Sequence, residues 1–240
     1  MAEIDLTILQ PGQKLPALAG YPGDFADWIM AGMGPEPKRA RLVYPHRGDA
    51  LPPADEPGAV VVTGSGAMVT AGDAWMQRSA DWLAQAVAAG RPVLGICFGH
   101  QLLAHALGGR VLDNPRGVEV GTVPLALEPA AAGDPLFASL TEPLRVHVSH
   151  LQSVTVPPPG ARRLASSELD PNQAFVCGER AWGVQFHPEF SAAVARAYLE
   201  FHSPTLHAQS RDPGALVAAI GDTPAGSRLL RNFARLAGLV

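Results

Sequence analysis

The sequence has few cysteines, few lysines and no long apolar run. Of its 240 residues only two are cysteine, and only Lys14 and Lys38 are lysine. Two cysteines make no disulfide framework, and one well-placed cysteine suits a nucleophile in a reducing compartment. No segment approaches the roughly 20 apolar residues of a transmembrane helix, and the acids near the N-terminus are unlike a signal peptide. We therefore expect a cytoplasmic location and no membrane partner.

Positive charge is also sparse. The formal net charge is −4, so there is no basic footprint for nucleic acid, and no nucleic-acid partner is expected. Apolar residues make up 47% and charged residues 17%, which is ordinary for a globular protein. A chain of this length can form one large α/β domain or two small ones, and it can bury a self-sufficient core.

Strand and helix patterns alternate in the first half. Residues 4–9, 41–44, 59–63 and 92–96 read as strands, and the run at 59–63 is continuous and β-branched, as in a parallel sheet buried on both faces. Asp24 opens a helix. Asp73 is a candidate N-cap for an alanine-rich helix over 74–89 that ends at Gly90.

The second half has strands in succession and then helices. Strands are predicted at 122–127, 145–149, 163–167, 174–177 and 182–186, and helices at 191–202, 214–220 and 228–238. The apolar C-terminus could pack on the core or on a second subunit, so the oligomeric state is left open. This order predicts one α/β domain over 1–240, with a central, mostly parallel sheet flanked by helices. The helical extension covers 191–240.

The sharpest local pattern surrounds Cys97, in the run PVLGICFGHQLLAHALGG at 92–109. A buried strand ends at Cys97, a helix begins at once, and Gly95 and Gly99 flank the cysteine. This is a cysteine version of the nucleophile elbow, Gly-x-Nuc-x-Gly. The glycines relieve clashes in a strained turn. The amides at the helix N-terminus favour thiolate and offer an oxyanion donor, with Phe98 N–H as the first candidate.

This turn has two other interpretations. Most cysteines are small buried core residues, and glycine-rich turns between strand and helix also bind phosphates. The turn lacks the Lys and Ser/Thr of a P-loop, and no Gly-x-Gly-x-x-Gly follows a strand. A nucleophilic Cys97 is the favoured interpretation, with a core cysteine as the alternative.

The run VQFHPEF at 184–190 supplies partners for a nucleophile. His187 falls at the end of a predicted strand, Pro188 stops the strand, and Glu189 follows. A cysteine nucleophile needs a base, and that base needs an orienting group. Alone, His187 would usually be a core or surface histidine. Beside Glu189 and a cysteine elbow, it is predicted to be the base.

These two runs together resemble the class I (triad) glutamine amidotransferase family, over roughly residues 59–189. Three further segments carry the resemblance: VTGSG at 62–66, VEVG at 118–121 and VSHLQSV at 148–154. GYPGDFADW at 20–28 and the overall outline look closest to stand-alone, GMP-synthase-like members. The resemblance implies a flavodoxin-like fold and a triad of Cys97, His187 and Glu189.

The resemblance also implies the residues around the triad. Ser65 N–H would join Phe98 N–H as oxyanion donor, and the implied substrate contacts are Gly64, Gln101, Ser149, Leu151 and Gln152. The sequence departs from the family pattern at two places. Ser65 and Gly66 stand where many members have Gly-Pro, and Gln152 stands where they often have Asp. The second change removes one counter-charge for the ammonium group of glutamine.

The expected activity is hydrolysis of the side-chain amide of glutamine through a γ-glutamyl thioester, without cofactor or metal. Histidines and acids show no zinc-type spacing. Three alternatives stay open: a γ-glutamyl peptidase acting on glutathione-type conjugates, a subunit idle until a separate synthase subunit docks, and a protease of the same broad fold. The ligand is expected to be glutamine or another γ-glutamyl small molecule.

Overall fold

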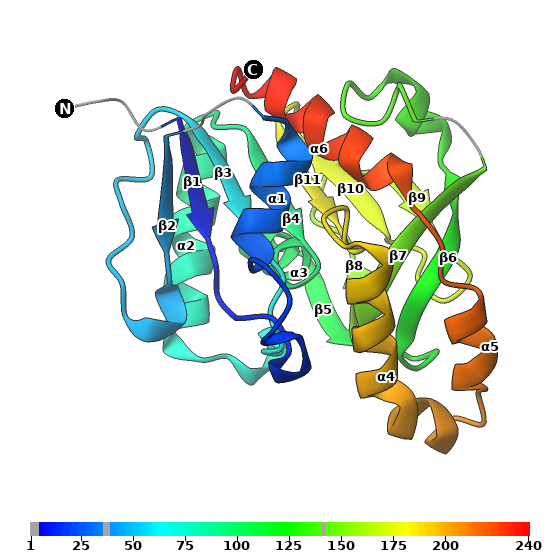
Figure 1. Ribbon diagram of the computed structural model, residues 1–240. Coiled ribbons are helices and arrows are strands. Elements are labelled where there is room, and N and C mark those ends of the chain that lie inside the picture. Colours follow the sequence, from blue (N-terminus) through cyan, green and yellow to red (C-terminus); the bar gives the residue numbers. More distant parts are fainter. Residues whose placement is uncertain (1–4, 36–38, 141–142) are drawn as a thin grey trace.

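The computed structural model describes residues 5–35, 39–140 and 143–240 (Figure 1). Its strands are β1 (Leu6–Leu9), β2 (Ala40–Val43), β3 (Ala59–Val62), β4 (Val93–Ile96), β5 (Arg110–Asp113), β6 (Glu119–Leu127), β7 (Leu144–His150), β8 (Gln152–Val156), β9 (Arg162–Ser166), β10 (Ala174–Cys177) and β11 (Ala181–Val184). Its α-helices are α1 (Phe25–Met33), α2 (Ala74–Ala88), α3 (Phe98–Ala106), α4 (Ala192–Ala208), α5 (Pro213–Ala218) and α6 (Pro224–Leu236). Short 3-10 turns are η1 (Pro16–Leu18), η2 (Pro45–Arg47), η3 (Val69–Ala71) and η4 (Pro129–Gly133).

Nine of these strands form one sheet, in the order β2-β1-β3-β4-β11-β10-β9-β6-β7. The five strands from β2 to β11 are parallel, and the strands from β10 to β7 pair antiparallel. A separate antiparallel pair joins β5 to β8. The α/β fold class predicted from the sequence is confirmed. Because β3, β4 and β11 run the same way, the segments that follow them meet at one edge of the sheet.

Helices cover both faces of the parallel strands. Figure 1 shows α1 and α6 in front of the sheet and α2 and α3 behind it. Strand β3 shows the alternation that this requires: Val61 packs in the cluster that holds Ile29 and Leu230, whereas Val60 and Val62 pack in the cluster that holds Leu83. Burial on both faces is why this strand is a continuous apolar run.

Several element boundaries differ from the sequence prediction. Strand β11 ends at Val184, not at residue 186, and β6 begins at Glu119, not at residue 122. The β5–β8 pair was not predicted. Helix α4 runs on to Ala208 through Pro204, past the predicted end at residue 202. Asp73 is the N-cap of α2, but its side chain makes no capping hydrogen bond. Part of the predicted strand at residues 4–9, residue 4, lies outside the described residues.

The C-terminal helix α6 packs within the chain. Leu229, Leu230 and Phe233 are fully buried, so the apolar C-terminus covers the core of this chain. A Cβ atom on Gly226 would lie 2.4 Å from the backbone oxygen of Pro188, so the first turn of α6 sits directly on the segment between His187 and Glu189. Among the described residues, no helix has both the length and the apolar character needed to cross a membrane.

Candidate active site

Cys97 lies between β4 and α3 in a backbone conformation that side chains rarely adopt. Its φ is 52° and its ψ is −104°, and it is one of two non-glycine residues with positive φ in the described part of the chain. Such a conformation costs on the order of 1–3 kcal/mol and persists only where the surrounding structure holds it. The turn leaves Cys97 6% exposed, at the edge of the sheet where β3, β4 and β11 end.

The two glycines beside Cys97 are required by close backbone contacts. A Cβ atom on Gly95 would lie 2.4 Å from the carbonyl oxygen of Gly99. A Cβ atom on Gly99 would lie 2.2 Å from the carbonyl oxygen of Val62 on β3. Both distances are far below a normal carbon–oxygen contact, and backbone cannot move aside as a side chain can. The Gly-x-Cys-x-Gly pattern therefore has a steric cause, as the sequence predicted.

His187 and Glu189 follow β11 and form a buried pair. Nδ1–H of His187 donates to Oε1 of Glu189 over 2.7 Å, and the backbone N–H of His187 donates to the carbonyl of His147. The imidazole stacks on the ring of Phe190 with centroids 3.9 Å apart. On another side it meets Gly64, where a Cβ atom would lie 2.9 Å from its Cε1. The ring is therefore held in position by packing as well as by its carboxylate.

Charge around His187 favours its protonated form. Burial alone would lower the pKa of this histidine, but the Glu189 carboxylate and a hydrogen-bonded contact with Cys97 outweigh burial and raise it to about 10. The sulfur of Cys97 also lies 3.6 Å from the carbonyl oxygen of Ser149. The structure thus brings Cys97, His187 and Glu189 together, with the imidazole between the sulfur and the carboxylate.

A pocket of about 370 Å³ opens over Cys97. Of the residues predicted to contact substrate or oxyanion, Ser65, Phe98, Gln101, Ser149, Leu151 and Gln152 line it. Gly64 is not among the lining residues, because it packs against His187. The Ser65 hydroxyl donates to the carbonyl of Pro11 and accepts from the N–H of Ala67, so this side chain anchors its own loop.

Gln101 and Gln152 are already held by protein groups. The Gln101 amide donates to the carbonyl of Gln152 over 2.8 Å and to the side chain of Gln185 over 2.9 Å. The Gln152 amide donates to the Thr70 hydroxyl and to the Asp113 carboxylate. The glutamine at position 152 thus ties β8 to β5 and to η3. Gln152 lines the pocket, but both its amide nitrogen and its backbone carbonyl have partners within the protein.

Two sets of residues in or beneath the pocket were missed from the sequence. The first is a buried pair, His150 on β7 and Glu119 on β6, in which Nε2 of the imidazole lies 2.9 Å from the carboxylate. The second is one face of α4, which lines the pocket with Tyr198, Phe201, His202 and Thr205. Their spacing of three and four residues is the only sequence signal for this face. Among the described residues, no group of three or more His, Cys, Asp or Glu side chains could hold a metal ion.

Fold and geometry define an α/β protein with a cysteine at a nucleophile elbow. The chain belongs to the class I glutamine amidotransferase family, because the family profile, Glutamine amidotransferase class-I, matches residues 43–203. The family resemblance inferred from the sequence is confirmed.

Relatives at the sequence level include GMP synthases. A glutamine-hydrolysing GMP synthase of Thermus thermophilus is 36% identical over 151 residues, which are 62% of this chain and 23% of that protein. The corresponding enzyme of Aeropyrum pernix is 39% identical over 142 residues, 59% of this chain and 25% of that protein. The chain therefore spans about a quarter of the length of these relatives.

Solved structures match along nearly the whole chain. A glutamine amidotransferase from Methylobacillus flagellatus superposes with a TM-score of 0.76 at 25% identity, covering 98% of this chain and 94% of that one. A glutamine amidotransferase from Thermotoga maritima gives a TM-score of 0.75 at 22% identity, covering 99% of both chains, and this likeness shows the shared fold.

Proposed function

We propose that the chain hydrolyses the side-chain amide of glutamine to glutamate and ammonia, with Cys97 as nucleophile. His187 is the proton donor and acceptor, and Glu189 orients it. One observation carries the proposal: the strained elbow at Cys97 lies at the same pocket as the buried His187–Glu189 pair. A nucleophile, a base and an orienting carboxylate in contact are what acyl transfer requires.

In the first half of the reaction, the Cys97 thiolate adds to the amide carbonyl carbon. The protonated His187 then gives its Nε2 proton to the amide nitrogen, the carbon–nitrogen bond breaks, and ammonia leaves. A γ-glutamyl thioester remains on Cys97. The raised pKa of His187 suits this step, because an imidazolium is present at neutral pH to protonate the leaving group.

In the second half, neutral His187 takes a proton from a water molecule that adds to the thioester carbonyl. The carbon–sulfur bond then breaks, glutamate leaves, and Cys97 returns as thiolate beside imidazolium. Glu189 keeps the Nδ1 proton in place through both halves, so that the Nε2 side alone exchanges protons.

The oxyanion formed in each half needs donors at the elbow. We assign this role to the backbone N–H groups of Ser65 and Phe98, whose residues line the pocket with Cys97. Losing one such donor commonly costs about 3 kcal/mol of barrier. The Ser65 hydroxyl is used within its loop, so the amide is the proposed donor. Gln101, Ser149, Leu151 and Gln152 are the proposed contacts for the rest of the substrate.

Glutamate release from glutamine tests this proposal. Cys97→Ala should bring turnover below detection, whereas Cys177→Ala should retain it. Cys177 is the matched control because it is the other free cysteine and burial raises its pKa to about 11. Iodoacetamide at pH 7 should therefore alkylate Cys97 first and abolish activity in proportion. A Cys97→Ala protein with undiminished turnover would end the proposal.

A second candidate is an amidotransferase subunit that passes ammonia to a separate synthase. The chain matches only about a quarter of the GMP synthases, whose further length would correspond to the acceptor-activating part. A large rise in glutamine turnover on adding such a synthase, with no change in the Cys97→Ala blank, would favour this candidate. We also propose a cytoplasmic location, because a free catalytic thiol needs reducing conditions.

A further inference from the structure

The pocket over Cys97 extends beyond the residues that the proposed reaction uses. Its volume of about 370 Å³ falls in the range of cavities that bury ligands of roughly drug size, about 300–1,000 Å³. Some polar lining residues, Ser65, Gln101, Ser149 and Gln152, have a proposed role toward the oxyanion or the substrate, whereas others, Gln13, Tyr198, His202 and Thr205, have none. The remaining wall comes from elements that the proposed reaction does not use.

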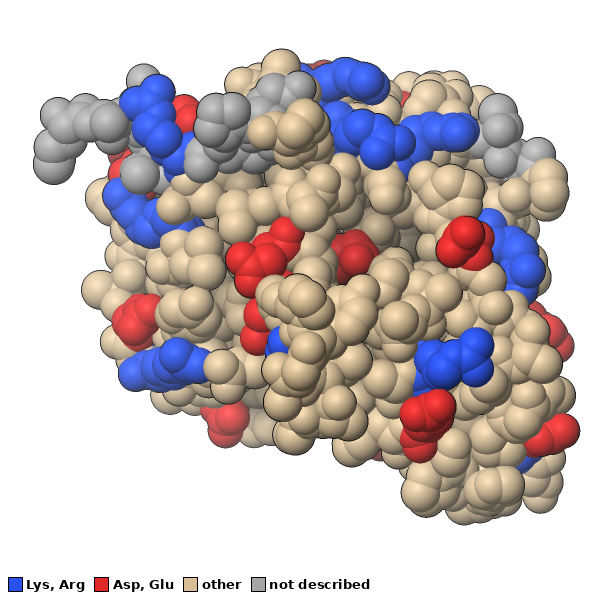
Figure 2. Space-filling model, in the orientation of Figure 1, with Lys and Arg blue, Asp and Glu red and all other residues tan. Residues whose placement is uncertain are grey.

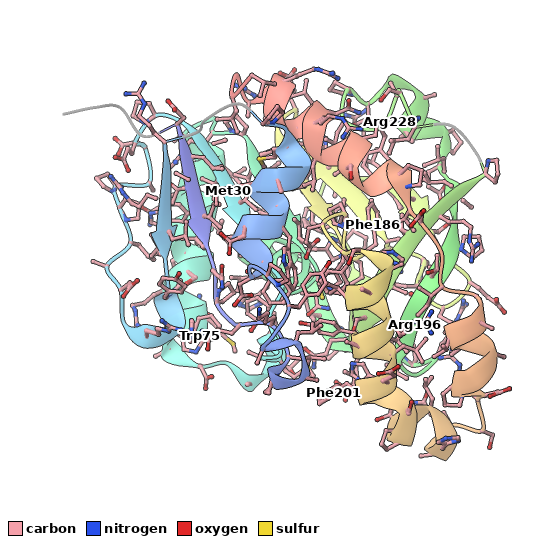
Figure 3. All side chains as sticks on the ribbon, in the orientation of Figure 1. Met30, Trp75, Phe186, Arg196, Phe201 and Arg228 are labelled. Carbon is pink, nitrogen blue, oxygen red and sulfur yellow. The ribbon has the colours of Figure 1, made fainter. Side chains whose placement is uncertain are left out.

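One such wall is a single face of α4. Tyr198, Phe201, His202 and Thr205 follow one another at helical spacing and all line the pocket. Figure 3 shows Phe201 leaving α4 on the side of the N-terminal loop, with Arg196 on the other side of the helix. The loop opposite contributes Leu15, and α4 contacts η1 in that loop. The pocket is therefore bounded by two elements that project beyond Cys97.

Apolar side chains at the rim of this wall are exposed to solvent. Phe201 is 59% exposed and Leu151 is 36% exposed, which are high values for large apolar residues. Leu15 and Met68 are half-buried and line the same pocket. Exposed apolar side chains that gather at one pocket, unlike single scattered ones, mark a ligand-binding or interaction site. Figure 2 shows uncharged atoms where Phe201 lies in Figure 3.

The rim also lacks charge. Among the described lining residues there is no Asp, Glu, Lys or Arg. His202 is the ionisable residue on the α4 wall besides Tyr198, and its pKa is lowered by burial and by the charge of His150, which leaves the ring neutral at pH 7. A charged substituent on the amide nitrogen would therefore find no carboxylate, lysine or arginine of opposite charge at this rim. The charged ends of the glutamyl part are assigned to the other side of the pocket, at Gln101 and residues 149–152.

We propose that the preferred substrate is a γ-glutamyl amide whose nitrogen carries an uncharged, apolar substituent. The side chains of Phe201, Leu151 and Met68 form the subsite for this substituent, and the backbone of Leu151 serves the glutamyl part. The inference rests on the proposed function and deepens it. The bond changes are the same: Cys97 adds to the γ-carbonyl, His187 protonates the nitrogen, and the amine leaves in place of ammonia. Water then releases glutamate from the thioester.

The experiment compares γ-glutamyl-anilide with glutamine as substrates of the full chain. We expect a higher kcat/KM for the anilide. Loss of an aromatic contact in a pocket commonly lowers kcat/KM by a factor of about 10 to 100. Because Phe201 is partly exposed, we expect Phe201→Ser to lower kcat/KM for the anilide about tenfold. The same variant should change glutamine turnover by less than about twofold, because the subsite is empty when ammonia is the leaving group.

Val156→Ser is the matched control. Val156 is 48% exposed, ends β8 and does not line the pocket. It should leave both substrates unchanged, which would show that loss of exposed apolar surface alone is not the cause. Circular dichroism and thermal unfolding of Phe201→Ser confirm that the variant is folded.

The outcomes separate the inference from the proposed function. Glutamine turnover that depends on Cys97, together with a slower anilide reaction, would overturn the inference alone. So would a Phe201→Ser variant that affects both substrates equally, or neither, which is the result expected if the rim binds a protein partner. Absence of turnover of both substrates, with Cys97 still alkylated selectively, would overturn both.

Discussion

Two buried histidine–glutamate pairs lie close to Cys97, and they differ in what their hydrogen bonds leave free. In the first pair, His187 uses Nδ1 for Glu189 and leaves Nε2 for the sulfur. In the second pair, His150 uses both nitrogens: Nε2 meets Glu119 at 2.9 Å and Nδ1 meets the carbonyl of Gln152 at 2.9 Å. A carbonyl can only accept, so Nδ1 of His150 must carry a proton.

The carboxylates differ in the same sense. Glu119 also accepts from the Ser167 hydroxyl over 2.7 Å and from the Gln173 amide over 2.6 Å. Oε2 of Glu189 is buried and, within the described part of the chain, has no hydrogen-bond partner. In the His150–Glu119 pair, both imidazole nitrogens and both carboxylate oxygens have partners, and we call it the saturated pair. In the His187–Glu189 pair, one carboxylate oxygen has none among the described residues, and we call it the open pair. The same two residue types can therefore hold a backbone or move a proton, depending on which atoms remain free.

The saturated pair supports the pocket from beneath. His150 holds the carbonyl of Gln152, and that carbonyl also accepts from the amide of Gln101. Burial would lower the pKa of His150, but its hydrogen bond and charge interaction with Glu119 raise it overall. We therefore propose that His150 and Glu119 are positioning residues, which hold Gln101 and Gln152, the proposed substrate contacts, in place.

The largest effect should come from breaking the open pair. His187→Asn removes the proton carrier, so kcat should fall about 10²–10⁴-fold while KM changes little. Steady-state glutamate release measures this change. His105→Asn, on the exposed side of α3, is the control and should keep full activity. Comparable kcat in the two variants would contradict the assigned role of His187.

Breaking the saturated pair should lower the free energy of unfolding more than it lowers the rate of catalysis. Glu119→Gln leaves the buried His150 without its counter-charge, which commonly costs about 3–5 kcal/mol. Urea unfolding measures it, and Glu128→Gln, which weakens a half-exposed pair with Arg163, should cost less than about 1 kcal/mol.

Kinetics of Glu119→Gln give a second readout. If the pair positions Gln101 and Gln152, KM for glutamine should rise while kcat falls less than about tenfold. A fall in kcat as large as that of His187→Asn would mean that both pairs take part in proton transfer.

The pH dependence of stability sharpens the comparison. His187 has a pKa of about 10 in the folded state, above the ordinary 6.5, so the folded chain keeps a proton that the unfolded chain has lost. This stabilisation is complete below pH 6.5 and is lost as pH rises toward 10, with a slope of at most about 1.4 kcal/mol per pH unit. The wild type should therefore lose its advantage over Glu189→Gln across this window. A constant difference in unfolding free energy would contradict the raised pKa.

The smallest effect should come from removing one hydrogen bond that Ser167 donates to the saturated pair. Ser167→Ala removes one of the donors to Glu119, and a hydrogen bond to a charged group is worth about 1.5–3 kcal/mol before the remaining donors adjust. Because Gln173 still donates, we expect a loss near the lower limit. Urea unfolding measures it, and a loss as large as that of Glu119→Gln would show that Ser167 is the main partner.

The sequence revealed the open pair and hid the saturated one for a physical reason. His187 and Glu189 are two residues apart, and the elbow at Cys97 is fixed by glycines two residues away, so short-range patterns suffice. Glu119 and His150 face each other across β6 and β7, and this contact depends on strand register. Register is set by the packing of the whole sheet, which local spacing does not specify.

Other differences have the same origin. Tyr198, Phe201 and His202 lie within the helix expected at residues 191–202, but which face of that helix lines the pocket depends on its packing against distant segments. Thr205 lies beyond the expected end, where α4 continues through Pro204 to Ala208. The substitution of Gln152 for the family's usual Asp was visible. Its consequence, a tie to Thr70 and Asp113, needed the paired strands β5 and β8.

The positive φ at Cys97 determines which substitutions at this position would be favoured by selection for stability. Glycine accepts such a backbone angle freely, so Cys97→Gly would relax the turn at the moment it deletes the thiol. Under the proposed function, the more stable chain would then be the inactive one. A screen that selects for thermal stability alone would enrich such variants at this position, which is a trade-off between stability and activity at a single residue.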